Sequence, residues 1–137
     1  MKRRTFLATA SATGAALAAA PVLASMQYTP GLVAQELAAG KTVFLDFTAT
    51  WCSTCAAQAR VIEALKAETP AYEQAISFID VDWDTYRNAD LTRSLEIPRR
   101  STLVVLKGDA ELGRLVAETG ASRIKALMDT ALAAATA

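Results

Sequence analysis

Short apolar runs alternate with helix-spaced apolar stripes from residue 30 to the end of the sequence. The runs are rich in β-branched and aromatic residues and are bounded by turn residues, which is typical of buried strands. This pattern predicts strands over residues 42–47, 76–81, 101–106 and 111–118. Residues 107–110 predict a hairpin turn before the last strand, and Gly113 predicts a bulge within it.

Helices are predicted between these strands and after them. Thr29 and Pro30 indicate a helix start and Gly40 a helix stop, which predicts a helix over residues 30–39. A short helix is predicted over residues 88–95. A long helix over residues 52–68 has an inner face formed by Cys55, Ala59, Ile62 and Leu65. Ser122 is expected to cap a last helix, whose apolar stripe comprises Ile124, Leu127, Met128, Ala131 and Leu132.

The order of these elements predicts one α/β domain. The strand, helix and strand over residues 42–81 fit a right-handed βαβ crossover, which makes two strands parallel, whereas the hairpin turn makes the last two antiparallel. We therefore expect a central mixed four-stranded sheet flanked by helices, over residues 25–137.

Residues 1–24 have the features of a cleavable export signal. Lys2, Arg3 and Arg4 are followed by an uncharged, alanine-rich apolar stretch, and small or apolar residues precede a cleavage site after Ala24. The stretch from Arg3 to Leu7 resembles the twin-arginine (Tat) export pattern. An ordinary Sec signal remains an alternative, and a retained membrane anchor is disfavoured by the many small residues.

Charge and composition exclude several classes of function. Residues 1–24 hold three of the 14 basic residues and none of the 14 acidic ones, so the remaining chain has a net charge of −3, which argues against nucleic acid as a partner. The sequence has no histidine, which excludes Ser-His-Asp and Cys-His hydrolases and histidine-ligated metals. Two cysteines cannot close a four-ligand metal site. We expect no metal and no cofactor.

The only two cysteines have CxxC spacing and directly follow the first predicted strand. They lie in the segment Trp51-Cys52-Ser53-Thr54-Cys55, at the predicted start of the long helix. Unpaired backbone N–H groups at a helix start favour a thiolate over a thiol. The thiolate is the form that attacks disulfides, so this segment is a candidate redox site.

These motifs and the order of elements resemble the thioredoxin family across residues 25–137. The resemblance is carried by the WCxxC motif at Trp51, Cys52 and Cys55, and by Asp46, six residues before Cys52, which matches the buried carboxylate of the family. The string from Asp46 to Cys55, with Asp82 and Trp83 downstream, looks most like the periplasmic C-terminal thioredoxin-like domain of DsbD-type reductases.

The resemblance implies a role for each site residue. Cys52 would attack a partner disulfide and Cys55 would resolve the mixed disulfide. Asp46 would exchange a proton with Cys55 during resolution, although a strand-end or capping carboxylate is the alternative. Trp51 would shield the dithiol and offer a flat docking surface, or else merely pack beside the loop. Ser53 and Thr54 would tune the helix start and the redox potential.

One departure from the family lies before the third predicted strand. The family places a cis-proline there, facing the dithiol, and the register of the strand puts Ser101 at that position, with Pro98 as the alternative. A non-proline residue favours a trans bond. Arg99 and Arg100 would then lie close to Cys52, where positive charge favours the thiolate, or they would be two solvated loop residues.

Together these features predict an exported, periplasmic thiol–disulfide oxidoreductase that acts on protein disulfides, more a reductase than an oxidase. A membrane electron donor of DsbD or CcdA type is what the resemblance implies as a partner. Two alternatives remain open. One is a non-catalytic interaction domain with a structural disulfide, and the other is a dimeric metal or iron–sulfur carrier that pools four thiolates.

Replacement of Arg3 and Arg4 by lysines is expected to strand the precursor in the cytoplasm, because the twin-arginine route reads the arginine pair. Cell fractionation followed by immunoblotting of precursor and mature forms checks this expectation. Undiminished export of the variant would instead indicate the Sec route.

Overall fold

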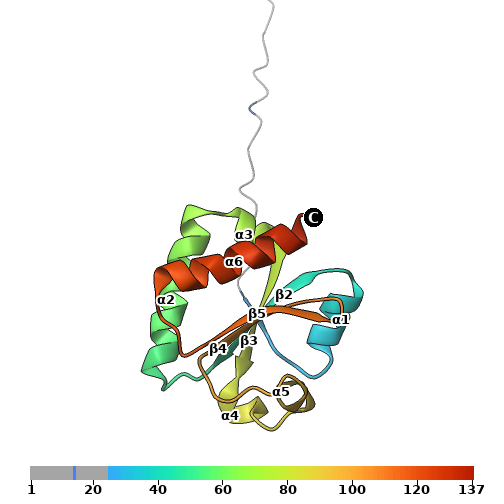
Figure 1. The fold of residues 1–137 in the computed structure, drawn as a ribbon, viewed down its shortest axis with the longest axis vertical. Coiled ribbons are helices and arrows are strands. Elements are labelled where there is room, and N and C mark those ends of the chain that lie inside the picture. The colour runs from blue at the N-terminus through green and yellow to red at the C-terminus, as the bar shows by residue number, and fades with distance from the viewer. Residues whose placement is uncertain (1–13, 15–24) are drawn as a thin grey trace, which may run out of the picture.

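The structure is a computed structural model that describes residue 14 and residues 25–137. The predicted export signal over residues 1–24 lies outside the described residues, apart from Gly14. Within residues 25–137, five strands form one mixed sheet in the order β1-β3-β2-β4-β5, with helices on both faces (Figure 1). The predicted α/β class with a mixed sheet is therefore confirmed.

The sheet contains one more strand than the four predicted. Its strands are β1 Met26–Gln27, β2 Thr42–Thr48, β3 Ile76–Asp82, β4 Thr102–Lys107 and β5 Ala110–Val116. β1 and β2 flank β3 in parallel, whereas β2, β4 and β5 pair in antiparallel fashion. The unpredicted strand β1 has only two residues, which is too short to give a periodic pattern. It forms because its backbone pairs with β3, next to which it is the edge strand of the sheet.

The bulge predicted in the last strand is present and lies beside the predicted glycine. Val105 pairs with Gly113 and Leu106 pairs with Glu111, so Leu112 is the extra residue of β5. A Cβ atom at Gly113 would lie 2.9 Å from the side chain of Leu127, so the missing side chain lets helix α6 (Ala121–Ala135) pack closely on the strand.

The helices follow the predicted ones, with shifted ends and two additions. The structure has α1 Leu32–Ala38, α2 Ser53–Glu68, α3 Ala71–Ala75, α4 Trp83–Tyr86 and α5 Asp90–Ser94 before α6. The short helices α3 and α4 were not predicted, because five and four residues are too few to show a helical period. α5 falls within the predicted range of residues 88–95.

The predicted helix caps of α1 and α6 are wrong. α1 begins after Gly31, which has a left-handed φ of 94°, because Thr29 and Pro30 form a turn in which the Leu32 amide bonds to the Thr29 carbonyl at 3.1 Å. α6 begins after Gly120, and Ser122 lies inside the helix rather than at its cap. No side chain caps this helix among the described residues.

The central strand β2 is buried on both faces, because helices cover both sides of the sheet. α2, α3 and α6 pack over one face, on a core that includes Phe44, Phe78 and Leu103. Residues of α1, α4 and α5 pack against the other face, where Leu45 and Ile79 lie. The alternation along β2 thus assigns Asp46, two residues after Phe44, to the face that α2 covers.

The inner face of α2 differs from the predicted one at a single position. Cys55, Ile62 and Leu65 are buried as expected, but Ala59 is exposed and Gln58 is buried in its place. Both positions are compatible with helical spacing from Cys55. Gln58 is the one turned inward, because its amide has partners in the loops beside the helix start, as described below.

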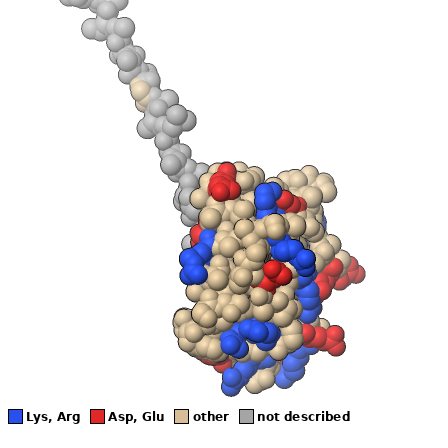
Figure 2. All heavy atoms as spheres, turned by 60° about the vertical axis from the view of Figure 1, so that its left-hand side comes forward, with Lys and Arg blue, Asp and Glu red and all other residues tan. Residues whose placement is uncertain are grey.

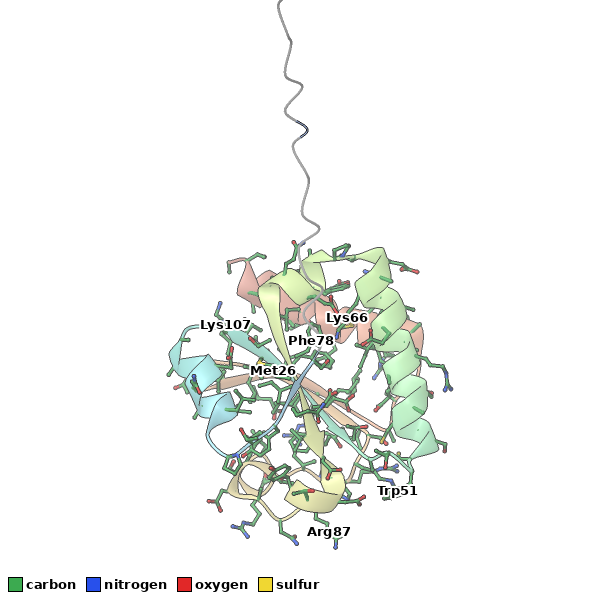
Figure 3. All side chains as sticks on the ribbon, turned by 180° about the vertical axis from the view of Figure 1, so that it is seen from behind. Met26, Trp51, Lys66, Phe78, Arg87 and Lys107 are labelled. Carbon is green, nitrogen blue, oxygen red and sulfur yellow. The ribbon has the colours of Figure 1, made fainter. Side chains whose placement is uncertain are left out.

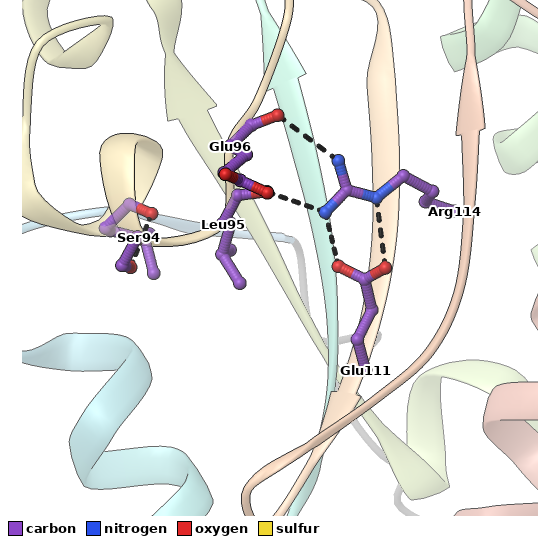
Figure 4. A network of polar contacts seen from close by, with 6 residues as sticks. Ser94, Leu95, Glu96, Glu111 and Arg114 are labelled. Atoms are coloured by element: carbon purple, nitrogen blue, oxygen red, sulfur yellow. Dashed lines mark hydrogen bonds and ion pairs between the residues drawn. The ribbon is translucent and has the colours of Figure 1, made fainter.

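The loop that follows α5 is held to the sheet by Arg114 of β5 (Figure 4). Its guanidinium donates to the carbonyl oxygens of Leu95 at 2.7 Å and Glu96 at 3.4 Å, and to the Glu111 carboxylate at 3.0 Å. Arginine suits this task because its planar group presents several donors in fixed directions. The network fixes the start of the segment that leads from α5 to Ser101.

Substitution of Leu103 by alanine is expected to lower the free energy of unfolding by about 3 kcal/mol, because its side chain is fully buried in the core beneath α2 and α6. Leu112→Ala is the matched control, since Leu112 is 37% exposed, and it should cost less than about 1 kcal/mol. Urea unfolding measures both values. Equal losses would contradict the described position of the core.

Candidate active site

Cys52 is the N-cap residue of α2, and its sulfur takes the place of a capping oxygen. The Cys55 amide donates a hydrogen bond to Cys52 Sγ at 3.2 Å, and the backbone of Cys52 is extended, with φ −92° and ψ 112°. Both cysteines are free thiols and both are buried. The predicted dithiol therefore lies at the helix start, where backbone N–H groups stabilise negative charge.

The surroundings of Cys52 lower its pKa to about 7. Burial by itself raises the pKa of this thiol, but the contacts of the sulfur outweigh it. The side chains of Cys55 and Ser101, the Cys55 amide and the Arg100 side chain all favour the thiolate and lower the pKa. Cys52 is thus more readily ionised at neutral pH than an ordinary cysteine, which favours its nucleophilic form.

Ser101 faces the dithiol from the loop before β4. Its hydroxyl oxygen lies 3.3 Å from Cys52 Sγ and 3.1 Å from Cys55 Sγ. Its backbone has a φ of 63°, a conformation that serine seldom adopts. No cis peptide bond occurs in residues 25–137, and Pro98 is exposed, so the alternative that gives Pro98 the place opposite the dithiol is wrong.

Hydrogen bonds on both sides fix the backbone of Ser101. Its amide donates to the Phe47 carbonyl of β2 at 2.7 Å, and its carbonyl accepts from the Ala117 amide at 2.9 Å. The Gln58 side chain donates to the same carbonyl at 3.0 Å and to the Glu118 carbonyl at 2.9 Å. Gln58 was not identified from the sequence. A polar residue on the apolar inner face of a helix is the signal that marks it.

Trp51 lies at the start of α2 and is 58% exposed (Figure 3). The Arg100 guanidinium lies 4.5 Å from the centre of its ring, and its indole Nε1 donates to the Asp84 carboxylate at 2.9 Å. The indole is thus held in place while its ring remains accessible. An ordered, exposed aromatic surface beside the dithiol is suited to contact a peptide.

The remaining predicted tuning residues differ in their position. Arg100 reaches the site, whereas the Arg99 guanidinium bonds to the neighbouring carbonyl of Arg100 at 3.0 Å and shapes the loop. Ser53 is exposed and Thr54 is half-buried, and within the described residues no side-chain hydrogen bond joins either of them to the dithiol. Trp83 packs against the cluster of Ala49 and the two cysteines, and the sequence did not reveal this contact.

Asp46 lies in β2, on the face covered by α2, with 8% of its surface exposed. Its pKa is raised to about 7, mainly by burial and then by the negative charges of Asp80 and Cys52, whereas Lys66 lowers it. Asp80 is its register partner in the parallel strand β3. Among the described residues, Asp46 Oδ1 has no hydrogen-bond partner. Asp46 therefore holds a proton in the neutral range, as an acid or base at this site must.

Lys66 brings a buried positive charge to the same face of the sheet. Its ammonium group lies 4.1 Å from the centre of the Phe78 ring and pairs with Glu63 at 3.5 Å and Glu73 at 3.6 Å (Figure 3). On this face of the sheet, a cavity of about 100 Å³ is lined by Asp46, Asp80 and Glu63, among others. The cavity gives the carboxyl groups room for water, which proton exchange requires.

Charges of both signs occur on the face shown in Figure 2, with basic side chains gathered at its lower end. The views share a vertical axis, so this is the end of the molecule where Trp51 lies in Figure 3.

In the described part of the chain, no group of three or more histidine, cysteine, aspartate or glutamate residues is arranged to hold a metal ion. None of the described helices is long and apolar enough to cross a membrane.

A mixed sheet that delivers a helix-capping thiolate, a second thiol one turn later and a buried carboxyl beneath them defines a redox-active dithiol protein. The family model described as Thioredoxin matches residues 26–130, so the chain belongs to the thioredoxin family. Thioredoxin homologues are thiol–disulfide oxidoreductases, and the family generally acts on protein disulfides.

Individual relatives agree with this family. A thioredoxin of Mycolicibacterium smegmatis is 33% identical over 94 residues, which cover 68% of this chain and 81% of the relative. The crystal structure of Trxlp from Edwardsiella tarda superposes with a TM-score of 0.64 at 30% identity, covering 75% of this chain and 98% of that one. A thioredoxin of Malassezia sympodialis has the same fold, with a TM-score of 0.62 at 24% identity.

Asp46→Asn is expected to stabilise the protein above neutral pH. The carboxyl pKa is raised from 3.8 to about 7, so the folded state keeps a proton that the unfolded chain loses, and the free energy of unfolding falls as the pH rises through this range. The variant should therefore gain up to about 4 kcal/mol at about pH 8 and nothing below about pH 4.

Urea unfolding at several pH values measures this gain, with Asp109→Asn as the control, because Asp109 is exposed in the hairpin turn. A gain that does not depend on pH would contradict the raised pKa of Asp46.

Proposed function

We propose that this protein is an exported thiol–disulfide oxidoreductase that reduces disulfides of protein substrates. The observation that carries the proposal is the Cys52 sulfur, which caps α2 and has a pKa lowered to about 7, with Cys55 one helical turn away. A thiolate of this kind is a nucleophile for disulfides at neutral pH. The neighbouring thiol is in position to complete the exchange.

The reaction has two exchange steps. The Cys52 thiolate attacks one sulfur of the substrate disulfide and forms a mixed disulfide. The first substrate sulfur departs as a thiolate and takes a proton from water, which replaces the proton that Cys52 released when it ionised. Cys55 then loses its proton and attacks Cys52 Sγ, which forms the Cys52–Cys55 bond and releases the second substrate thiol. The substrate gains two electrons and two protons, and the protein dithiol loses them. For the second step, the family resemblance names Asp46 as the candidate buried acid–base group, and its raised pKa is compatible with that role.

The acidity of Cys52 favours the reducing direction. Thioredoxin has a reactive cysteine with a pKa of about 7, whereas the strong oxidant DsbA has one near 3.5. A more acidic thiol stabilises the reduced form and makes the disulfide more oxidising. With a pKa of about 7, Cys52 resembles the reductase.

The surface around Cys52 supports a protein substrate. Trp51 offers an exposed ring beside the sulfur, and Arg100 is held against it, so an extended segment next to the substrate disulfide finds both an apolar and a basic contact. The export pattern of residues 1–24 supports the periplasm as the compartment of the proposed reaction. There the oxidised protein needs a source of electrons, and a membrane donor of DsbD or CcdA type is part of the proposal.

Reduction of insulin disulfides tests the function. The wild-type protein should precipitate the insulin B chain in the presence of dithiothreitol, and Cys52→Ser should abolish this activity because the attacking sulfur is removed. Ser53→Ala is the matched control, since Ser53 is exposed next to the same sulfur, and it should retain most of the activity.

The substrates themselves can be captured with a Cys55→Ser variant produced in the native compartment, because it cannot resolve the mixed disulfide. Covalent adducts should appear on non-reducing gels and disappear when Cys52 is also replaced. An absence of adducts through Cys52, together with inactivity towards insulin, would refute the proposed function.

A further inference from the structure

The hydroxyl group of Ser101 lies between the two sulfurs of the dithiol. Its oxygen is 3.1 Å from Cys55 Sγ and 3.3 Å from Cys52 Sγ. A serine hydroxyl can accept one hydrogen bond while it donates another. It can therefore accept from the Cys55 thiol and donate towards the Cys52 side at the same time. The exchangeable hydroxyl group of Ser101 thus links the sulfur of Cys55 to the sulfur of Cys52.

The fold holds this hydroxyl in place. Ser101 is fully buried, and hydrogen bonds to Phe47, Ala117 and Gln58 fix its backbone from β2, from the chain after β5 and from α2. Its positive φ of 63° is a strained conformation for a residue with a side chain. The surrounding contacts maintain this strain, and as a result the Cβ–Oγ bond points at the dithiol.

The resolution step of the proposed reaction needs a proton to move between two sulfurs. Cys55 must lose its proton before or while it attacks Cys52 Sγ, and the departing alkyl thiolate of the substrate must gain one. In the mixed disulfide the substrate sulfur is bonded directly to Cys52 Sγ, the atom 3.3 Å from the hydroxyl. The departing atom is therefore one bond away from an atom that Ser101 already contacts.

We propose that Ser101 is the catalytic proton carrier of the resolution step, an inference that rests on the proposed disulfide exchange. The Cys55 proton passes to Ser101 Oγ while the hydroxyl proton of Ser101 passes to the departing substrate sulfur. The Cys52–Cys55 bond forms and the bond between Cys52 and the substrate breaks. The dithiol is oxidised, the substrate is reduced, and serine is regenerated without any further reactant.

Asp46 is a second group near the dithiol that can take up a proton, but its position is less direct. Within the described residues, its buried Oδ1 has no hydrogen-bond partner, whereas Ser101 contacts both sulfurs. Asp46 lies in β2, in the middle of the sheet, and among the described residues no hydrogen bond joins its side chain to either sulfur. Ser101, by contrast, contacts both the Cys55 sulfur, which gives up the proton, and the Cys52 sulfur, to which the departing substrate sulfur is bonded.

The test compares Ser101→Ala and Ser101→Gly in the full reduced chain. Alanine removes only the hydroxyl oxygen, and glycine removes it while relieving the strain of the positive φ. Each protein is mixed with excess oxidised glutathione and the reaction is quenched with acid at successive times. Mass spectrometry of the intact protein then measures how much glutathione adduct remains. Both variants should resolve the mixed disulfide on the order of 100-fold more slowly than the wild-type protein. If alanine prevents folding, the glycine variant decides.

Two further measurements separate proton transfer from mere positioning. The attack step is followed alone in a Cys55→Ser background, where loss of the hydroxyl should slow it far less than it slows resolution. An aromatic disulfide, dithiobis(nitrobenzoate), replaces glutathione in the second measurement. Its thiolate departs without a proton because its thiol is much more acidic, so the defect of both variants should shrink about 10-fold or more.

Resolution of the glutathione adduct at the wild-type rate in both variants would overturn the proton-carrier role and leave the proposed function intact. An equal defect with both disulfides would also overturn it, because the serine would then act only by positioning the sulfurs. Failure of the wild-type protein to form any adduct would instead overturn the proposed function itself, and the proton-carrier role with it.

Discussion

The hydrogen bond from the Cys55 amide to the Cys52 sulfur joins the fold of this protein to its chemistry. The first amides of a helix have no partner within the helix, and at α2 a sulfur supplies one. That sulfur is fixed by the strand before it, because β2 is buried on both faces and ends only a few residues earlier. The nucleophile therefore cannot move without uncapping the longest helix of the described chain.

Patterns within one element could be read from the sequence, whereas contacts between distant elements could not. The strands β2, β3 and β4 were predicted nearly to the residue, because their burial leaves a continuous apolar run. The strand β1 was missed, since its two residues are ordered by pairing with β3 rather than by their own pattern.

The same distinction applies to the site. Cys52, Cys55 and Asp46 lie within ten residues of one another, and the family motif identifies them. Gln58 is fixed by carbonyl groups 43 and 60 residues away, so no local pattern indicates its role. The contact of Lys66 with Phe78 likewise depends on the packing of α2 against β3, so no local pattern predicts it. Ser101 was placed by its register relative to β4, but its contacts with both sulfurs required the structure.

The buried charges beneath α2 show what the site costs in stability. A buried carboxyl such as Asp46, next to a second carboxyl at Asp80, destabilises the fold when it ionises. Lys66 offsets part of that cost, because its ammonium group lies over the Phe78 ring and beside acidic residues. An apolar residue in place of Asp46 would make a better core. Its retention fits a trade-off between stability and activity.

The φ of 63° at Ser101 makes this loop differ by more than one side chain from the proline loop that the family resemblance implies. Proline fixes φ near −65°, the opposite sign, so a proline introduced at this position alone could not enter the existing loop. It would also lose the amide that bonds to Phe47. Conversion of this loop to the proline form, or the reverse, would therefore need several coordinated changes along the path from α5 to β4.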